Sequence, residues 1–249
     1  MTTTNDKYSL RFLGVGSGGN PELGCAAAVL EQDQQALLLI DCGSGVINRF
    51  QARYQTLPDA VYISHNHLDH IADLEILFIR VLLAKEKNPQ QPLVRLFVPV
   101  QLIHQLHLRL ACYPGAMAEG GKNFWDAFQL IPVTEQFLHA GIKFEIFPSR
   151  HHAPLSSFAL YAPGLFFYSG DTRPIPEIIH HQVQKGEVIF HDCGLHSNPS
   201  HTGLTDLQEY QPAVQQQLVL YHYASEQDGQ QLTAAGYQVA QADAIYPLN

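Results

Sequence analysis

The segment His65-Asn66-His67-Leu68-Asp69-His70 concentrates side chains that bind metal ions. Imidazole nitrogen and carboxylate oxygen are the ligands that hold zinc and similar divalent ions. His65 and His67 lie two positions apart, so in an extended loop they point to one side and share one metal. Asp69 and His70 follow at the start of an expected helix and face a second metal. A solvated polar turn is the alternative, but four ligand-type residues in six favour a metal site.

These residues must be positioned by the elements around them. The chain alternates short apolar runs with amphipathic stretches, which indicates sheet layered with helices. A buried strand at Ala60–Ile63 is expected directly before the histidine segment, and a helix at Leu68–Ala84 after it. Phe124–Val133 and Phe137–Phe147 are expected to pair as antiparallel strands around a loop and an Ala140-Gly141 turn. Further strands are expected at Tyr8–Leu13, Cys25–Leu30, Ala36–Asp41, Val94–Val98, Ser157–Tyr161, Leu165–Ser169, Val188–His191 and Leu218–His222, and further helices at Val46–Tyr54, Val100–Leu110, Ile175–Gln184, Leu204–Gln211 and Glu226–Ala235.

Histidines and aspartates follow the ends of several expected strands. They are Asp41, His65, Asp171, Asp192 and His222. Side chains that leave strand ends at one edge of a sheet converge on a common point, which is the usual place for a site in layered α/β folds. The sequence therefore predicts one site assembled from distant segments.

The pattern HxHxDH after a short buried strand resembles the signature of the metallo-β-lactamase superfamily. Leu13–Gly18 resembles its N-terminal Gly-rich turn, Leu38–Gly43 its LLIDCG strand, and Ser169–Thr172 its SGDT segment. The resemblance runs through nearly the whole chain. It implies an α/β fold, a four-layer α/β/β/α sandwich formed by residues 1–249 as one domain, with the site at one edge.

The remaining metal ligands are implied by this resemblance. Asp171 is expected to bridge the two metals, and His222, at the end of a late strand, to be the last ligand. The superfamily supplies one more histidine, for which His151 and His152 are adjacent candidates, and spacing to the following aromatic strand favours His152. The hypothesis places His65, His67 and His152 on one metal and Asp69, His70 and His222 on the other, with Asp171 between them. The ions are expected to be Zn²⁺, with Mn²⁺ or iron equally compatible with these ligands.

A hydroxide held between two such ions is available near neutral pH, because metal binding lowers the pKa of water from 15.7 towards about 7. The chain is therefore expected to be a binuclear metal-dependent hydrolase. Asp69 is expected to act in catalysis as well as in metal binding. Asp73, where the superfamily often has glycine, is expected to narrow the pocket or to provide an outer carboxylate.

Ser200-His201-Thr202 bears on the substrate, because it resembles a histidine motif of the phosphodiesterase branch, which includes tRNA 3′-end-processing endonucleases and cyclic-phosphate hydrolases. A histidine that is not a ligand suits phosphodiester cleavage, where the departing oxygen needs a proton. The alternative is that Thr202 or Thr205 caps the following helix and His201 is merely exposed. A small phosphodiester or cyclic nucleotide is the expected substrate. The competing readings are a lactonase or other acyl hydrolase on the same fold, and a non-catalytic metal-dependent ligand-binding protein.

Composition limits the partners. The chain has 249 residues, 46% of them hydrophobic, and a net charge of −9. This charge, with no long basic insertion, argues against structured nucleic acid as a partner. No apolar run is long enough to cross a bilayer, and residues 1–7 lack the features of a signal peptide, so we expect a cytoplasmic protein without a membrane partner. The four cysteines form no CxxC pair and are expected to be free thiols. A homodimer is expected only from the habit of the superfamily.

Overall fold

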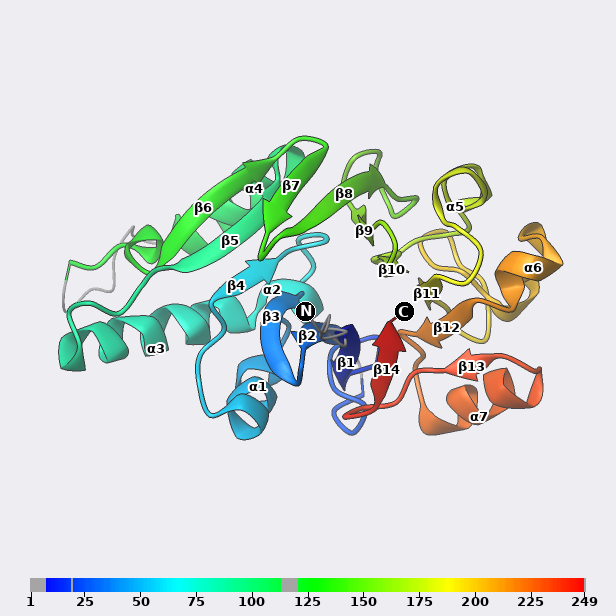
Figure 1. Cartoon of the computed structure of the whole chain (residues 1–249), viewed down its shortest axis with the longest axis horizontal. Coiled ribbons are helices and arrows are strands. Elements are labelled where there is room, and N and C mark those ends of the chain that lie inside the picture. The colour runs from blue at the N-terminus through cyan, green and yellow to red at the C-terminus, as the bar shows by residue number, and fades with distance from the viewer. Residues whose placement is uncertain (1–7, 19, 113–120, 249) are drawn as a thin grey trace, which may run out of the picture.

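The protein consists of two mixed β-sheets packed face to face, with helices on the outer side of each (Figure 1). The structure is a computed structural model that describes residues 8–18, 20–112 and 121–248. The helices of the N-terminal half cover the first sheet, and those of the C-terminal half cover the second. This arrangement confirms the predicted α/β/β/α sandwich.

The first sheet has seven strands, in the spatial order β14 (Ile245–Leu248), β1 (Tyr8–Gly14), β2 (Ala27–Gln32), β3 (Gln35–Ile40), β4 (Ala60–Tyr62), β5 (Val94–Pro99) and β6 (Phe128–Val133). The second has the order β13 (Gln238–Val239), β12 (Leu218–Tyr221), β11 (Val188–Asp192), β10 (Phe166–Tyr168), β9 (Phe158–Ala162), β8 (Ile142–Pro148) and β7 (Gln136–His139). The helical segments are α1 (Val46–Tyr54), α2 (Leu68–Ile71), α3 (Asp73–Lys87), α4 (Val100–Leu106), η1 (His107–Ala111), η2 (Phe124–Asp126), α5 (Pro176–Gln182), η3 (Leu204–Glu209), α6 (Pro212–Gln215) and α7 (Glu226–Ala234).

The core lies between the sheets and is rich in aromatic rings. Phe12 of β1 contacts Phe190 and Tyr221 of the second sheet, with ring centroids 5.5 Å apart in both pairs. At the other end Phe137 of β7 stacks on Phe97 of β5 at 4.3 Å. Such rings bury large apolar areas, so these contacts hold the sheets together and place their strand ends beside one another.

Two predictions about local structure are wrong. The runs around β6 and β7 do not pair. β6 adds in parallel to β5 in the first sheet, whereas β7 and β8 form a hairpin in the second. The hairpin turn explains this pairing, because Ala140 and Gly141 both have positive φ (50° and 79°), as a two-residue turn between antiparallel strands requires.

The expected helix at Leu68–Ala84 is divided into α2 and α3 at Ala72. The backbone N–H of Asp73 leaves the helical ladder and donates to the carbonyl oxygen of Cys42 at 2.9 Å. The N–H of Cys42 in turn donates to the carbonyl oxygen of His70 at 2.7 Å. This exchange ties the end of the histidine segment to the loop after β3.

A buried ion pair links β1 and β2. Arg11 Nε lies 2.8 Å from Glu31 Oε1, which also accepts from the Tyr54 hydroxyl at 2.6 Å, while Ser9 donates to Oε2. Burial acts to raise the pKa of Glu31, but the hydrogen bonds from Arg11 and Tyr54 outweigh it and hold this pKa below its usual value. The charged form of Glu31 therefore stabilises the fold.

Candidate metal centre

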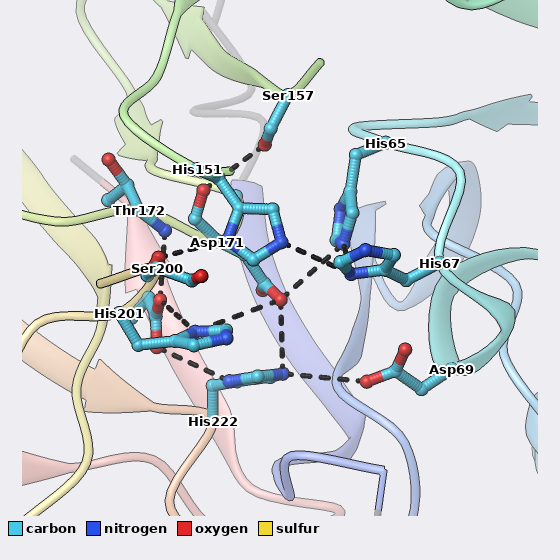
Figure 2. Close-up of polar contacts among 12 residues, drawn as sticks. His65, His67, Asp69, His151, Ser157, Asp171, Thr172, Ser200, His201 and His222 are labelled. Carbon is cyan, nitrogen blue, oxygen red and sulfur yellow. Dashed lines mark hydrogen bonds and ion pairs between the residues drawn. The ribbon is translucent and has the colours of Figure 1, made fainter. Parts of the chain in front are cut away.

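The histidine segment lies where the two sheets meet. His65 follows β4, His67 is the residue before α2, and Asp69 and His70 belong to α2. The loop is attached to the second sheet, because the N–H of Phe158 donates to the carbonyl oxygen of Ser64 at 3.0 Å. Side chains from both sheets can therefore face one point, as Figure 2 shows.

The first group of candidate ligands consists of His65, His67, His151 and Asp171. His67 Nδ1 lies 3.1 Å from the Nε2 atoms of both His65 and His151. His65 Nε2 lies 3.5 Å from Asp171 Oδ2. The four residues reach this point from three separate loops, following β4, β8 and β10.

The second group consists of Asp69, His70 and His222, and Asp171 lies beside it. Asp171 Oδ2 is 3.4 Å from His70 Nε2 and 3.3 Å from His222 Nε2. Asp69 Oδ2 is 3.6 and 3.7 Å from the same two nitrogens. Asp171 Oδ2 therefore stands between the two groups, where a bridging ligand would have to lie.

Both groups fit a divalent metal ion. Zinc bonds of 2.0–2.1 Å at tetrahedral angles place neighbouring ligand atoms about 3.3 Å apart, close to the separations above. Within the described residues, His70 Nε2, His222 Nε2 and both Asp171 carboxylate oxygens are buried without a hydrogen-bond partner. Buried polar atoms are normally satisfied, so these four atoms need a ligand that the chain does not supply.

The buried carboxylates of the cluster also favour positive charge beside them. Burial acts to raise the pKa of Asp171, but His222 and His70 outweigh it and hold this pKa well below its usual value. Burial acts to lower the pKa of His222, but the carboxylates of Asp171 and Asp192 raise it to about 10. Protons on histidine thus balance the buried carboxylates. A bound cation would take over that role and release the protons.

The structure places His151, not His152, among the candidate ligands. His151 is buried, and its Nδ1 donates to the carbonyl oxygen of Ser200 at 2.9 Å, which leaves Nε2 to face the cluster. His152 is exposed, has a φ of 48°, and its Nδ1 lies 3.0 Å from Ser200 Oγ. Of the two adjacent candidates, the structure therefore brings His151 into the ligand group in place of the expected His152.

Asp41 holds the ring of His70 in place. Its Oδ2 accepts from His70 Nδ1 at 2.8 Å and from Ser64 Oγ at 2.7 Å, and all three residues are buried. This bond fixes the proton of His70 on Nδ1, so that Nε2 presents its lone pair to the cluster. Asp41 itself has a φ of 64° at the end of β3, which turns its side chain towards the histidine segment.

Asp192 was expected only to lie at a strand end, and the structure brings it into the site. Its Oδ2 accepts from His201 Nδ1 and from the N–H of Thr172, both at 2.8 Å, and its Oδ1 lies 3.3 Å from His222 Nδ1. One buried carboxylate therefore orients both His222 and His201, and these three residues form a further candidate metal group with Asp171. The signal available in the sequence was its position at the end of β11, immediately before the loop that carries His201.

His201 lies inside the site and is not merely exposed on the surface. Its ring stacks on His222, with centroids 5.0 Å apart, and its side chain remains 23% exposed. Thr202 Oγ1 donates to the carbonyl oxygen of Thr172, whereas Gly203 and Asp206 form the cap of η3. The alternative that Thr202 or Thr205 caps this helix is therefore wrong, because the N-cap is Gly203 and Thr205 lies within η3.

Two further sequence features have structural roles. Asp73 Oδ2 accepts from the N–H of Ile47 in the first turn of α1 at 2.9 Å, and Asp73 is not among the residues that line the cavity at the candidate metal centre. The expectation that it narrows the pocket is wrong. Gly18, in the Gly-rich turn, has a φ of 70°, and a Cβ there would lie 2.7 Å from Cβ and Oδ2 of Asp69. Only glycine leaves room for this carboxylate.

The cluster opens into a cavity of about 400 Å³. Its lining includes His67, Asp69, Asp171, His201 and His222. The dimensions suit a small polar molecule rather than a polymer.

None of the helices in the described part of the chain is long and apolar enough to span a membrane.

The architecture is that of the metallo-β-lactamase fold. It is similar to the metallo-β-lactamase fold protein YhfI from Bacillus subtilis, with a TM-score of 0.75 and 14% identity over 97% of this chain and 100% of that one. It is also similar to a diphosphatase of the PhnP family, with a TM-score of 0.74 and 17% identity over the same shares of the two chains.

The sequence places the chain more narrowly within this fold. Residues 8–246 match the family described as Anti-Pycsar protein Apyc1, and the chain belongs to that family. The Anti-Pycsar protein Apyc1 of Paenibacillus harenae is 31% identical over 221 residues, which cover 86% of this chain and 89% of the relative.

Proposed function

We propose that the protein is a metal-dependent phosphodiesterase that hydrolyses a small cyclic nucleotide. The observation that carries this proposal is the convergence of groups of candidate ligand atoms on Asp171, with His201 Nδ1 4.0 Å from its Oδ2. His201 also forms a candidate group with Asp171, Asp192 and His222, and we assign it to proton transfer because Asp192 accepts from its Nδ1. The cavity volume and the net charge of −9 both favour a small substrate over a nucleic acid. Membership of the Apyc1 family supports a cyclic nucleotide as that substrate.

In this proposal His65, His67 and His151 hold one metal ion, and Asp69, His70 and His222 hold the other, with Asp171 shared. Zn²⁺ suits these nitrogen and oxygen ligands, as do Mn²⁺ and iron. Two ions at this point would supply Lewis acidity and a nucleophilic hydroxide near neutral pH.

The remaining chemistry falls to the chain itself. Cleavage of a phosphodiester bond leaves an alkoxide oxygen that needs a proton. In this proposal His201, which lines the cavity and whose Nδ1 is bound by Asp192, supplies that proton from Nε2. Asp192 acts as a positioning residue, since it also holds His222. Asp41 does the same for His70.

The test combines metal analysis of the purified protein with turnover of bis-p-nitrophenyl phosphate and of the common 3′,5′-cyclic mononucleotides. We expect about two divalent ions per chain, and no turnover after Asp171→Ala. His201→Ala should keep the metal and slow cyclic nucleotide hydrolysis by about 10²- to 10⁴-fold, the usual contribution of a general acid. A protein without metal and without turnover would refute the proposal.

The two competing functions give different results in the same experiment. A lactonase would cleave lactones or thioesters and would leave bis-p-nitrophenyl phosphate and the cyclic mononucleotides intact. A metal-dependent binding protein would contain metal and hydrolyse neither phosphodiesters nor lactones.

A further inference from the structure

The cavity at the metal centre has a second set of lining residues that take no part in holding metal. They are Ser17, Leu195, His196, Asn198 and Asp228. Ser17 belongs to the Gly-rich turn, Asp228 to the first turn of α7, and the others to the loop that follows β11. A substrate whose phosphate sits at the metal centre must place its remaining atoms along this wall.

Asp228 contributes a carboxylate to that wall, and Ser225 fixes its position. Ser225 Oγ donates to Asp228 Oδ1 at 2.8 Å and accepts from the backbone N–H of Asp228 at 3.1 Å. Asp228 is half-buried, and its Oδ2 has no partner among the residues that the structure describes. One oxygen is thus anchored to the helix terminus, and the other is available to the cavity.

Asn198 is held in a similar way. Its Oδ1 accepts from the backbone N–H groups of Ser200 and His201, at 2.8 and 3.0 Å. Because the amide oxygen is occupied by two donors, the Nδ2 group is the part of this side chain that remains to meet a ligand. The wall therefore offers one oriented acceptor at Asp228 and one oriented donor at Asn198, beside the apolar side chain of Leu195.

A carboxylate in this position cannot serve the phosphate, because like charges repel. It can only accept hydrogen bonds, and it is matched by a neutral donor on the rest of the substrate. On a cyclic nucleotide such donors are the ribose 2′-hydroxyl and the N–H groups of the base. Carboxylates elsewhere in nucleotide-binding folds recognise ribose hydroxyls in this way.

We propose that Asp228 is a specificity-determining residue that accepts a hydrogen bond from the nucleoside part of the substrate. This inference rests on the proposed function, since it requires a cyclic nucleotide at the metal centre. It assigns the wall at Asn198 and Asp228 to the nucleoside and leaves the phosphate to the metal ligands.

The chain offers a matched control for this residue. Glu226 lies in the same turn of α7, so its neutralisation changes the charge of the helix terminus by the same amount. Glu226 lines a different cavity, of about 580 Å³, together with Glu22 and Gln230. Asp228→Asn keeps an oxygen for Ser225, which protects the helix terminus, whereas Glu226→Gln leaves the wall untouched.

The experiment measures kcat and KM of the metal-loaded wild type, Asp228→Asn and Glu226→Gln. The substrates are cyclic AMP, GMP, CMP and UMP, their 2′-deoxy forms, and bis-p-nitrophenyl phosphate, which has no nucleoside. We expect Asp228→Asn to lower kcat/KM for the preferred ribonucleotide about tenfold, mainly through KM, because the oxygen that accepts from the substrate is replaced by an NH₂ donor. Turnover of bis-p-nitrophenyl phosphate should not change, and Glu226→Gln should match the wild type throughout.

The pattern of loss identifies the donor. If the 2′-hydroxyl is bound, Asp228→Asn removes the preference of the wild type for ribose over deoxyribose. If the base is bound, Asp228→Asn removes the preference of the wild type among the four bases. Equal kinetics of Asp228→Asn and wild type on every cyclic nucleotide would overturn the inference, and so would an equal loss on bis-p-nitrophenyl phosphate. A wild type that cleaves bis-p-nitrophenyl phosphate but no cyclic nucleotide would instead refute the proposed function and this subsite with it.

Discussion

Asp192→Asn is the substitution that tests most directly how the metal centre is organised. The change keeps the size of the side chain and replaces one carboxylate oxygen by an NH₂ group. In one orientation this NH₂ group faces the donors of Thr172 and His201, and in the other it faces Nδ1 of His222. Either way the NH₂ group meets an unfavourable neighbour, because one wild-type oxygen accepts from two donors and the other lies 3.3 Å from His222 Nδ1 in an ion pair.

The expected magnitude follows from these contacts. A hydrogen bond to a charged acceptor contributes about 1.5–3 kcal/mol, which corresponds to roughly a 10- to 150-fold change in an equilibrium constant. Carboxylates that orient metal ligands typically change metal affinity or activity by about 10- to 100-fold when they are replaced. We therefore expect Asp192→Asn to weaken binding of one Zn²⁺ ion about 10- to 100-fold.

The assay is competition for Zn²⁺ against a chromogenic chelator, followed by turnover of the cyclic nucleotide that the wild type prefers, at low and at saturating Zn²⁺. Saturating Zn²⁺ should restore the share of turnover lost through His222, but not the share lost through His201. Asp206→Asn is the matched control, because Asp206 accepts from the N–H of Gly203 in the neighbouring loop and does not line the cavity. Wild-type zinc affinity and turnover in Asp192→Asn, in a folded protein, would show that this carboxylate does not organise the centre.

Three further predictions test other parts of the structure. His151→Ala should lose about one of the two metal ions proposed per chain, whereas His152→Ala should keep both, and elemental analysis of the two variants decides between them. Gly18→Ala and Gly164→Ala should each lower the free energy of unfolding by about 1–2 kcal/mol, because both glycines have positive φ. Only Gly18→Ala should slow turnover, since a Cβ at position 164 meets nothing within 4 Å. Glu31→Gln should destabilise the fold by about 3 kcal/mol at pH 7. The folded pKa of Glu31 lies below its usual 4.5, so its contribution is present above about that pH and is lost as the pH falls through the folded value; denaturant titrations across this range should therefore show a flatter acid response in the variant than in the wild type.

The local patterns of the sequence indicated much of the site. HxHxDH combines a strand end, a loop and a first helical turn within six residues, so its geometry depends on short-range backbone preferences that can be judged from spacing alone. The strand ends at Asp171 and His222 were visible for the same reason, because β10 and β12 are short apolar runs. The structure brings these residues together within 3.3 Å.

The choice between His151 and His152 was different. The two residues have the same side chain and adjacent positions, so composition and spacing treat them almost alike. The deciding features are the left-handed backbone at His152 and the carbonyl oxygen of Ser200, which lies 49 positions from His151 and holds its Nδ1. No local pattern contains that contact.

The sequence by itself determined the apolar runs, the turns and the cluster of ligand-type side chains, because each depends on residues that are close along the chain. Only the tertiary structure decided that β6 and β7 belong to different sheets, that one carboxylate at Asp192 serves both His201 and His222, and that Asp73 faces α1. These outcomes depend on which distant surfaces pack together. The free energy of that packing is shared among many buried contacts between the sheets, and no single segment carries it.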